Sequence, residues 1–160
     1  MTAIPSSAPT STSSTGGTDH RPNRLLVGVD GSDESVVALR RAAEMAAATG
    51  GSVRAVTCWS YPVLVAAEDA IPFDLLEQGA AEAQGEALTA AFGANRPERL
   101  ETAIIQGGAS RVLVEESRNA DLLVVGSRGH GGFAGLLLGS VSMACAEHAH
   151  CDVLVVRGRE

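Results

Sequence analysis

The sequence predicts a single α/β domain in which a parallel sheet lies between helices on both faces. Short apolar runs alternate with longer segments of helical periodicity, which is the pattern of repeated β-α-β units. Hydrophobic residues make up 45% of the 160-residue chain, but aromatic residues only 3%. The core is therefore expected to be aliphatic, as in a parallel sheet covered by alanine-rich helices. Right-handed crossovers would place helices on both faces of the sheet.

The first 23 residues differ in composition from the rest of the chain. Residues 1–23 are rich in Ser, Thr, Pro and Gly. Such a segment buries too little apolar surface to offset the entropy lost on ordering, so we expect a disordered tail. Residues 24–160 are long enough to form one domain with a substantial core.

The first unit of the domain is a strand followed by a helix. Arg24–Asp30 is a largely apolar run and is predicted to be the first strand. Ser32 is suited to cap the following helix, and the acidic residues Asp33 and Glu34 suit its positive end. Gly50 is suited to end that helix. Between these limits, apolar residues recur at helical spacing at Val36, Leu39, Ala43 and Ala46.

Two further β-α units are expected in the middle of the chain. Ser52–Trp59 is predicted to be the second strand, and residues 60–72 a linker. A helix is predicted over Phe73–Phe92, with one apolar stripe formed by Phe73, Leu76, Ala80, Ala83, Ala87 and Ala91. Leu100–Ile105 is predicted to be the third strand, and residues 107–119 lead into and form a third helix.

The last part of the chain supplies two strands and one helix. Asp121–Val125 is predicted to be a buried fourth strand, and Val153–Val156 the final strand. Between them, a glycine-rich loop leads into a helix predicted over Val141–His150. A strand, a glycine-rich loop and a helix in this order form a common phosphate-binding arrangement.

The glycine-rich loop carries the strongest functional signal. Gly126, Gly129, Gly139 and Ser140 have the spacing Gly-x2-Gly-x9-Gly-Ser. Glycine allows close approach of the backbone to an anion and a positive φ. The unpaired amides of the first helical turn would point at the anion. The hydroxyls of Ser140 and Ser142 would either donate to phosphate or cap their own helix. The sequence therefore predicts a phosphorylated ligand.

Two familiar phosphate-binding motifs do not fit this loop. A Walker A loop needs a lysine before its Ser or Thr, but Leu138 precedes Gly139-Ser140 and the chain contains no lysine. The dinucleotide fingerprint fails because Ala134 breaks its spacing. That fingerprint also follows the first strand of a domain, whereas this loop follows a late one.

The Gly-x2-Gly-x9-Gly-Ser spacing resembles the nucleotide-binding signature of the universal stress protein family. Leu25–Ser32, Asp121–Gly126 and Cys151–Arg157 resemble the first, fourth and last strands of that family with their flanking residues. The resemblance covers residues 24–157. It implies an adenine nucleotide alpha hydrolase-like fold, a single three-layer domain with a five-stranded parallel sheet of order 3-2-1-4-5.

This implied order brings two separate motifs together. Asp30 and Gly126 would end neighbouring strands, at the crevice where ligands of such sheets bind. The resemblance implies that Asp30 contacts the nucleotide, the alternative being a turn residue. It also implies that Gly28, Val29 and Cys58 line an adenine pocket, the alternative being core packing. The full set of expected ATP-binding residues is Gly28, Val29, Asp30, Cys58, Val125, Gly126, Arg128, Gly129, Gly139, Ser140, Val141 and Ser142.

The sequence leaves alternatives open for two polar residues of the loop. Arg128 is expected either to neutralise a phosphate oxygen or to be a solvated loop charge. His130 is expected to be a loop residue and not a general base, because no nucleophile with an orienting carboxylate is evident. No catalytic residue and no metal ligand is predicted; Mg²⁺ would enter as a bridge between phosphates.

The function expected from this reasoning is that of an ATP-binding stress-response regulator, at most a slow ATPase. An enzyme of the wider adenylate-handling α/β group is one alternative, although its His-x-Gly-His and Ser-Gly-Gly-x-Asp-Ser motifs are absent. The other alternative is an interaction protein that binds no nucleotide. The intact glycine signature argues against that alternative.

Charge and composition limit the other partners. A net charge of −7 argues against binding to nucleic acid and to anionic membranes. Neither a membrane-spanning run nor a secretory signal is evident, so we expect a cytoplasmic protein. Three cysteines, Cys58, Cys145 and Cys151, form no Cys-x-x-Cys pair and are expected to be buried thiols.

The last strand is expected to lie at an edge of the sheet. The resemblance implies that a homodimer pairs along this edge, through Val153, Leu154, Val155 and Val156. Protection of the edge by the last helix or by Arg157 is the alternative. His150 and Asp152 stand where the family often carries proline, which concerns the turn before this strand and not the phosphate loop.

Overall fold

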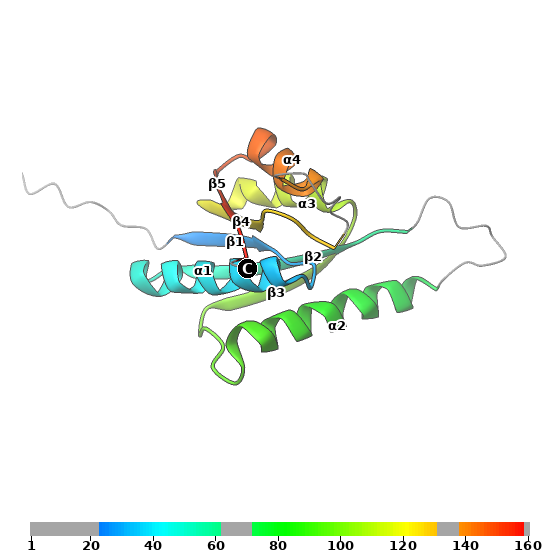
Figure 1. Cartoon of the computed structure of the whole chain (residues 1–160), viewed down its shortest axis with the longest axis horizontal. Helices are drawn as coiled ribbons and strands as arrows, with labels where there is room; N and C mark the ends of the chain where they lie inside the picture. Colours follow the sequence, from blue (N-terminus) through cyan, green and yellow to red (C-terminus); the bar gives the residue numbers. More distant parts are fainter. Residues whose placement is uncertain (1–22, 62–71, 131–137, 159–160) are drawn as a thin grey trace, which may run out of the picture.

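Five parallel strands form one sheet in the computed structural model, which describes residues 23–61, 72–130 and 138–158 (Figure 1). The strand order is β3-β2-β1-β4-β5, as the family resemblance implied. The strands are β1 (Arg24–Gly28), β2 (Ser52–Trp59), β3 (Leu100–Gln106), β4 (Leu122–Gly126) and β5 (Asp152–Val156).

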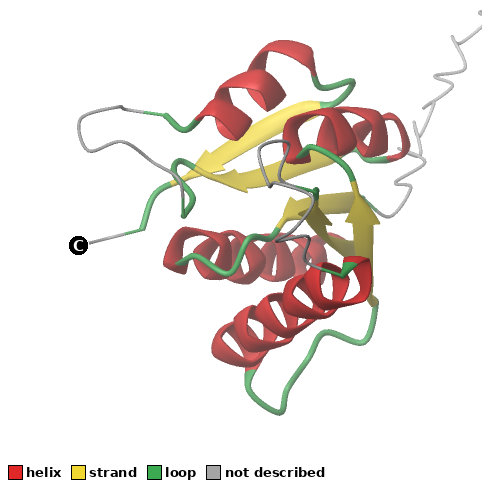
Figure 2. Ribbon diagram, turned by 90° about the vertical axis from the view of Figure 1, so that its right-hand side faces the viewer, coloured by secondary structure: helices red, strands yellow, loops and turns green. Residues whose placement is uncertain are grey.

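Helices cover both faces of this sheet. They are α1 (Asp33–Thr49), α2 (Phe73–Phe92), α3 (Ala109–Glu116) and α4 (Ser140–His148). Figure 2 shows the sheet between helices on its two sides. One apolar core lies between the sheet and α1 with α2, and a second lies between the sheet and α3 with α4. Both cores are almost entirely aliphatic, as the composition predicts. The helices on both faces of the sheet confirm the three-layer α/β architecture. In the described part of the chain, no helix combines the length and apolarity needed to cross a membrane.

The predicted elements are all present, with small differences at their ends. The bounds of β2 and α2 agree with the prediction. Strand β1 ends at Gly28, so Val29 and Asp30 lie just beyond it. The third helix ends at Glu116 and continues as a 3₁₀ turn over Ser117–Asn119. Most of the predicted tail (residues 1–23) and of the predicted linker (residues 60–72) lies outside the described residues, at residues 1–22 and 62–71.

The first helix is fixed at both ends by the residues that the sequence indicates. The Ser32 hydroxyl accepts a hydrogen bond of 3.2 Å from the Ser35 N–H, as an N-cap does. Gly50 has a φ of 66°, and its N–H donates to the carbonyl of Ala46. A residue with a side chain is strained in that left-handed conformation, so glycine suits this position.

Helix α2 departs from its predicted apolar stripe at its beginning. Phe73 is 56% exposed, although its ring contacts those of Trp59 and Tyr61 with centroids 6.1 and 5.1 Å apart. The C-terminal half of the helix is the buried part, through Gln84, Ala87, Leu88 and their neighbours. The stripe pattern missed Gln84, because a polar residue is not expected in an apolar face.

Candidate functional site

A pocket of about 290 Å³ opens at the carboxyl ends of β1 and β4. These two strands are neighbours, and the chain leaves them toward opposite faces of the sheet, through α1 and α4. This is the switch point at which parallel α/β sheets bind their ligands. All of the predicted binding residues line this pocket, namely Gly28, Val29, Asp30, Cys58, Val125, Gly126, Arg128, Gly129, Gly139, Ser140, Val141 and Ser142.

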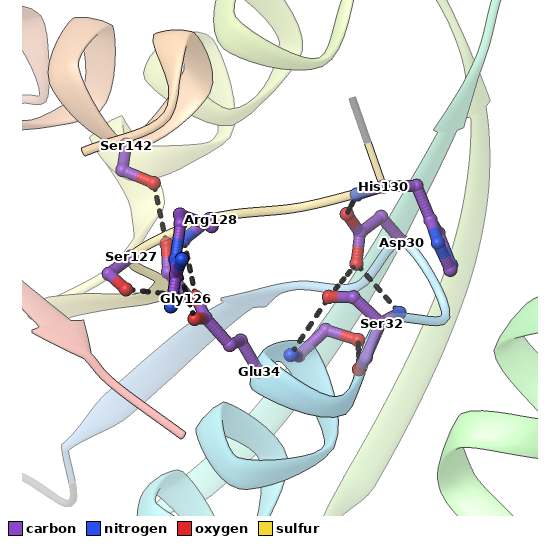
Figure 3. A network of polar contacts seen from close by, with 9 residues as sticks. Asp30, Ser32, Glu34, Gly126, Ser127, Arg128, His130 and Ser142 are labelled. Atoms are coloured by element: carbon purple, nitrogen blue, oxygen red, sulfur yellow. Dashed lines mark hydrogen bonds and ion pairs between the residues drawn. The ribbon is translucent and has the colours of Figure 1, made fainter. Parts of the chain in front are cut away.

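Asp30 forms one side of the pocket mouth. Its carboxylate accepts hydrogen bonds from the Ser32 N–H at 3.0 Å, the Ser32 hydroxyl at 2.6 Å and the His130 N–H at 3.2 Å (Figure 3). Desolvation favours the protonated carboxyl, but these hydrogen bonds outweigh it and hold the pKa of Asp30 below its ordinary value of 3.8. Asp30 is therefore a carboxylate at neutral pH and a hydrogen-bond acceptor.

The first turn of α4 forms the opposite side. Gly139 is the N-cap, and the bond from the Met143 N–H to the Gly139 carbonyl, 3.0 Å long, is the first of the helix. The N–H groups of Ser140, Val141 and Ser142 precede that bond and have no partner within the helix. Together with the helix dipole, they make this turn suited to an anion.

Neither serine hydroxyl caps this helix, so one alternative from the sequence is wrong. Gly139 occupies the cap position and no side chain bonds the first turn. The hydroxyl of Ser142, which is buried, instead donates to the Gly126 carbonyl at 2.5 Å. That bond joins the start of α4 to the end of β4 across the glycine-rich loop, so Ser142 has a structural role here.

The three glycines of the Gly-x2-Gly-x9-Gly-Ser signature differ in how much space each position leaves for a side chain. A Cβ on Gly126 would lie 2.8 Å from the Cβ of Glu34, and one on Gly129 would collide with the Asp30 carboxylate. A Cβ on Gly139 would make ordinary contacts, the nearest at 3.5 Å. In the described residues, positive φ occurs at other glycines and not at these three. Close approach, and not a left-handed backbone, therefore explains Gly126 and Gly129.

Arg128 does not stand free in solvent. Its guanidinium pairs with the carboxylate of Glu34 on α1, with Nε 3.4 Å from Oε1. The backbone N–H of Arg128 donates a hydrogen bond to the same carboxylate. Half of the Arg128 side chain is exposed, and the residue also lines the pocket. The structure thus adds a third possibility to the two foreseen, a loop arginine shared between the pocket and an internal carboxylate.

The apolar end of the pocket lies between β1, β2 and α3. Gly28, Val29 and Cys58 form this wall with Val56 and Leu113. A Cβ on Gly28 would lie 2.8 Å from a methyl group of Leu113, so glycine lets α3 pack against β1. This wall is apolar, in contrast to the polar side that Asp30 forms.

The thiols are weakly acidic. Desolvation, aided by the charge of Glu116, raises the pKa of the Cys58 thiol to about 11, and desolvation raises that of Cys145 to about 11. Thiols of this kind are protonated at neutral pH and are poor nucleophiles.

Within the described ranges, no group of three or more His, Cys, Asp or Glu side chains is placed to hold a metal ion.

Sequence reasoning missed part of the pocket lining. The lining residues not foreseen are Ser32, Ser35, Val56, Ala109, Leu113 and His130. The serines had been assigned only to the start of a helix or left without a role. The apolar residues carry no chemical signal and are recognised only once the strands and helices are assembled. Glu34, just outside the lining, was foreseen only as a favourable charge at a helix start.

Comparison with known proteins finds similarity to universal stress proteins. The model of the "Universal stress protein family" matches residues 22–157. Universal stress protein Rv2005c of Mycobacterium tuberculosis is 37% identical over 139 residues, which are 86% of this chain and 46% of that protein. The chain spans about half the length of the curated relatives that it matches.

Solved structures show the same architecture. The universal stress protein UspA from Lactobacillus plantarum superposes with a TM-score of 0.71 at 22% identity, covering 86% of this chain and 99% of that one. A universal stress protein in complex with cAMP superposes with a TM-score of 0.59 at 32% identity, covering 84% and 96%. By its sequence, its fold and its match to the family model, this chain belongs to the universal stress protein family.

Proposed function

We propose that this protein binds an adenine nucleotide, ATP in the first instance, and acts as a nucleotide-dependent regulator of a cytoplasmic stress response. One observation carries the proposal: residues predicted from separate segments of the sequence line one pocket at the switch point of the sheet. The relative solved with cAMP supports a nucleotide of the adenine class. ATP itself is inferred from the family resemblance of the loop.

Each part of the pocket suits one part of such a nucleotide. The N–H groups of Ser140, Val141 and Ser142 would bind phosphate, beside the loop backbone at Gly126 and Gly129. The Asp30 carboxylate would accept hydrogen bonds from ribose hydroxyls. The apolar wall near Cys58 would contact the base. Bound Mg²⁺ would offset phosphate charge.

Hydrolysis is expected to be slow at most. The residues described in the pocket include no lysine to follow a leaving phosphate. Asp30 has a lowered pKa, which makes it a weak general base. Regulation through nucleotide occupancy is therefore the function that these residues favour over turnover.

Gly139→Leu tests the proposal without endangering the fold. Gly139 has a φ of −73°, which any residue adopts, and a Cβ at this position makes only ordinary contacts, the nearest at 3.5 Å. A leucine there would stand beside the first-turn amides and block phosphate. We expect the dissociation constant for ATP to rise by about tenfold or more, because charge-assisted hydrogen bonds are lost. Isothermal titration calorimetry measures this change.

Gly79→Leu is the matched control, because Gly79 lies on α2 with open space at its Cβ position. It should bind ATP as the wild type does. Mass spectrometry of small molecules released from gently purified protein gives an independent test. A wild type that releases no adenylate and shows no calorimetric response to millimolar adenylates would leave only the nucleotide-free interaction protein.

We further propose that two copies of the chain pair along β5. This strand is at the edge of the sheet, bonded to β4 on one side. Its residues Val153, Leu154 and Val155 are only partly buried within one copy. An apolar edge strand of this kind is covered in most proteins, and an isologous dimer would cover it in both copies at once.

A further inference from the structure

Glu34 of α1 holds the start of the glycine-rich loop through two successive residues. Its carboxylate accepts hydrogen bonds from the Ser127 hydroxyl at 2.9 Å and from the Arg128 N–H, and it pairs with the Arg128 guanidinium (Figure 3). The Glu34 side chain is only 14% exposed. A carboxylate so placed and so well bonded is a fixed part of the structure and not a solvated surface charge.

Glu34 acts from behind the loop. Neither Glu34 nor Ser127 is among the residues that line the pocket, whereas Gly126 and Arg128 are. The Cβ of Glu34 would be 2.8 Å from a Cβ on Gly126, so the helix packs directly against the backbone that turns into the loop. Glu34 therefore sets where the loop leaves β4 without occupying the space of a ligand.

Ser127 is the residue through which this contact reaches the whole loop. It is 1% exposed, its N–H donates to the Val156 carbonyl at 2.6 Å, and its carbonyl accepts from the Gly139 N–H at 2.7 Å. The bond to Gly139 joins the two ends of the loop at the start of α4. The Glu34 carboxylate completes these bonds by fixing the Ser127 side chain, so all three polar groups of Ser127 are held.

The same carboxylate is also paired with a cation of the pocket lining. Among the described residues that line the pocket, Arg128 is the only arginine, and its partner is Glu34. The sequence of residues 131–137 adds no charged side chain, and the chain has no lysine. Asp30 adds a second carboxylate at the mouth. The cation that a phosphate would attract is thus already held by an anion of the protein.

We propose that Glu34 is a positioning and specificity-determining residue: it fixes the loop through Ser127, and by holding Arg128 it biases the site against the most highly charged adenylate. This inference rests on the proposed nucleotide site. AMP, ADP and ATP carry successively more negative charge, so their relative affinities report how much of the Arg128 charge is available. A purely structural Glu34 would affect all three nucleotides alike.

Glu34→Gln separates charge from hydrogen bonding. The amide oxygen still accepts from Ser127, but the negative charge is gone and Arg128 becomes available to phosphate. Calorimetry at low salt without Mg²⁺ should show the affinity for ATP relative to AMP rising by about threefold, the scale of a half-exposed ion pair. The gain should vanish in Glu34→Gln combined with Arg128→Ala.

Glu44→Gln is the matched control. Glu44 lies on the same helix, pairs with Arg41, and has a side chain 65% exposed. Glu44→Gln changes the net charge by the same amount as Glu34→Gln, so an effect of total charge would appear in both variants. An unchanged ratio of ATP to AMP affinity in Glu34→Gln, or an equal rise in both variants, would refute the specificity role.

A second measurement does not depend on a ligand. Glu34→Ala leaves the Ser127 hydroxyl and the Arg128 N–H without their acceptor, so amide hydrogen exchange at Ser127, Arg128 and Gly139 in the ligand-free protein should quicken by about tenfold. Exchange equal to that of Glu44→Ala would overturn the positioning role. If the wild type bound no adenylate, the proposed function would fail, and this exchange experiment would still decide whether Glu34 fixes the loop.

Discussion

At the scale of a single residue, the Asp30 carboxylate is held by hydrogen bonds from two separate segments of the chain. Its carboxylate is bonded to the residues that follow β1 and to the N–H of His130, which is 100 positions later in the chain. These bonds fix the orientation of the carboxylate and favour its charged form. The same bonds join the loop after β4 to the turn after β1, so Asp30 also contributes to stability.

Asp30→Asn should therefore lower stability in a pH-dependent way. The folded-state pKa is depressed, so the stabilisation is present above the ordinary value of 3.8 and is lost as pH falls through the folded-state pKa. We expect the variant to be less stable by about 1 kcal/mol at neutral pH. Urea unfolding between neutral pH and pH ~3 should show this difference shrinking in acid. A difference that stayed constant over that range would contradict the assignment.

At the scale of an element, α2 shows how a helix is anchored by one polar residue. Gln84 is buried, and its side-chain nitrogen Nε2 lies 3.2 Å from the Ala55 carbonyl oxygen, 3.1 Å from the Thr57 hydroxyl and 3.1 Å from the Ala103 carbonyl oxygen. These partners belong to β2 and β3. The amide thus joins the helix to two strands through hydrogen bonds inside the core.

Gln84→Leu should destabilise the protein although its volume fits the core. The leucine removes the donors to Thr57 and to the strand carbonyls, and we expect the free energy of unfolding to fall by about 1–2 kcal/mol. Gln78→Leu, on the exposed part of the same helix, should change it by less than about 0.5 kcal/mol. Thermal and urea unfolding measure both. Equal losses in the two variants would show that the buried amide has no special role.

At the scale of the whole molecule, sheet order decides both the site and the free edge. Because β1 lies between β2 and β4, the ends of β1 and β4 adjoin and form the pocket. The same order leaves β5 at an edge with one bonded neighbour. The Val156 carbonyl faces β4, since it accepts from the Ser127 N–H. Alternate residues of a strand point their backbone groups in opposite directions, so those of Val155 face outward.

Val155→Pro should consequently break the proposed dimer and leave the fold intact. Proline is tolerated on an edge strand where its N–H would face outward. We expect the dissociation constant of the dimer to rise by about tenfold or more, because an inter-subunit hydrogen bond is lost and the ring obstructs pairing. Sedimentation velocity measures the association, and Val155→Thr, which keeps the N–H, is the control. A wild type that sediments as a monomer at all concentrations would refute pairing along β5.

Much of the architecture could be predicted because it depends on local pattern. The apolar runs of β2 and β4 and the cap residues Ser32 and Gly50 are recognisable within a few positions. Phe73 was misplaced because helical spacing identifies a stripe but not how far the sheet extends beneath it. The bond from the Ser142 hydroxyl was not foreseen because its acceptor, the Gly126 carbonyl, lies 16 residues away.

The sequence by itself determined the kinds and succession of the elements and, through its glycine spacing, the class of ligand to expect. Only the tertiary structure decided that Glu34 holds Ser127 and Arg128, residues 93 and 94 positions away, and that Gly126 and Gly129 are needed for close packing. The physical reason is range. Periodicity and capping act over one or two turns, whereas these contacts exist only after the crossovers bring α1 beside the end of β4.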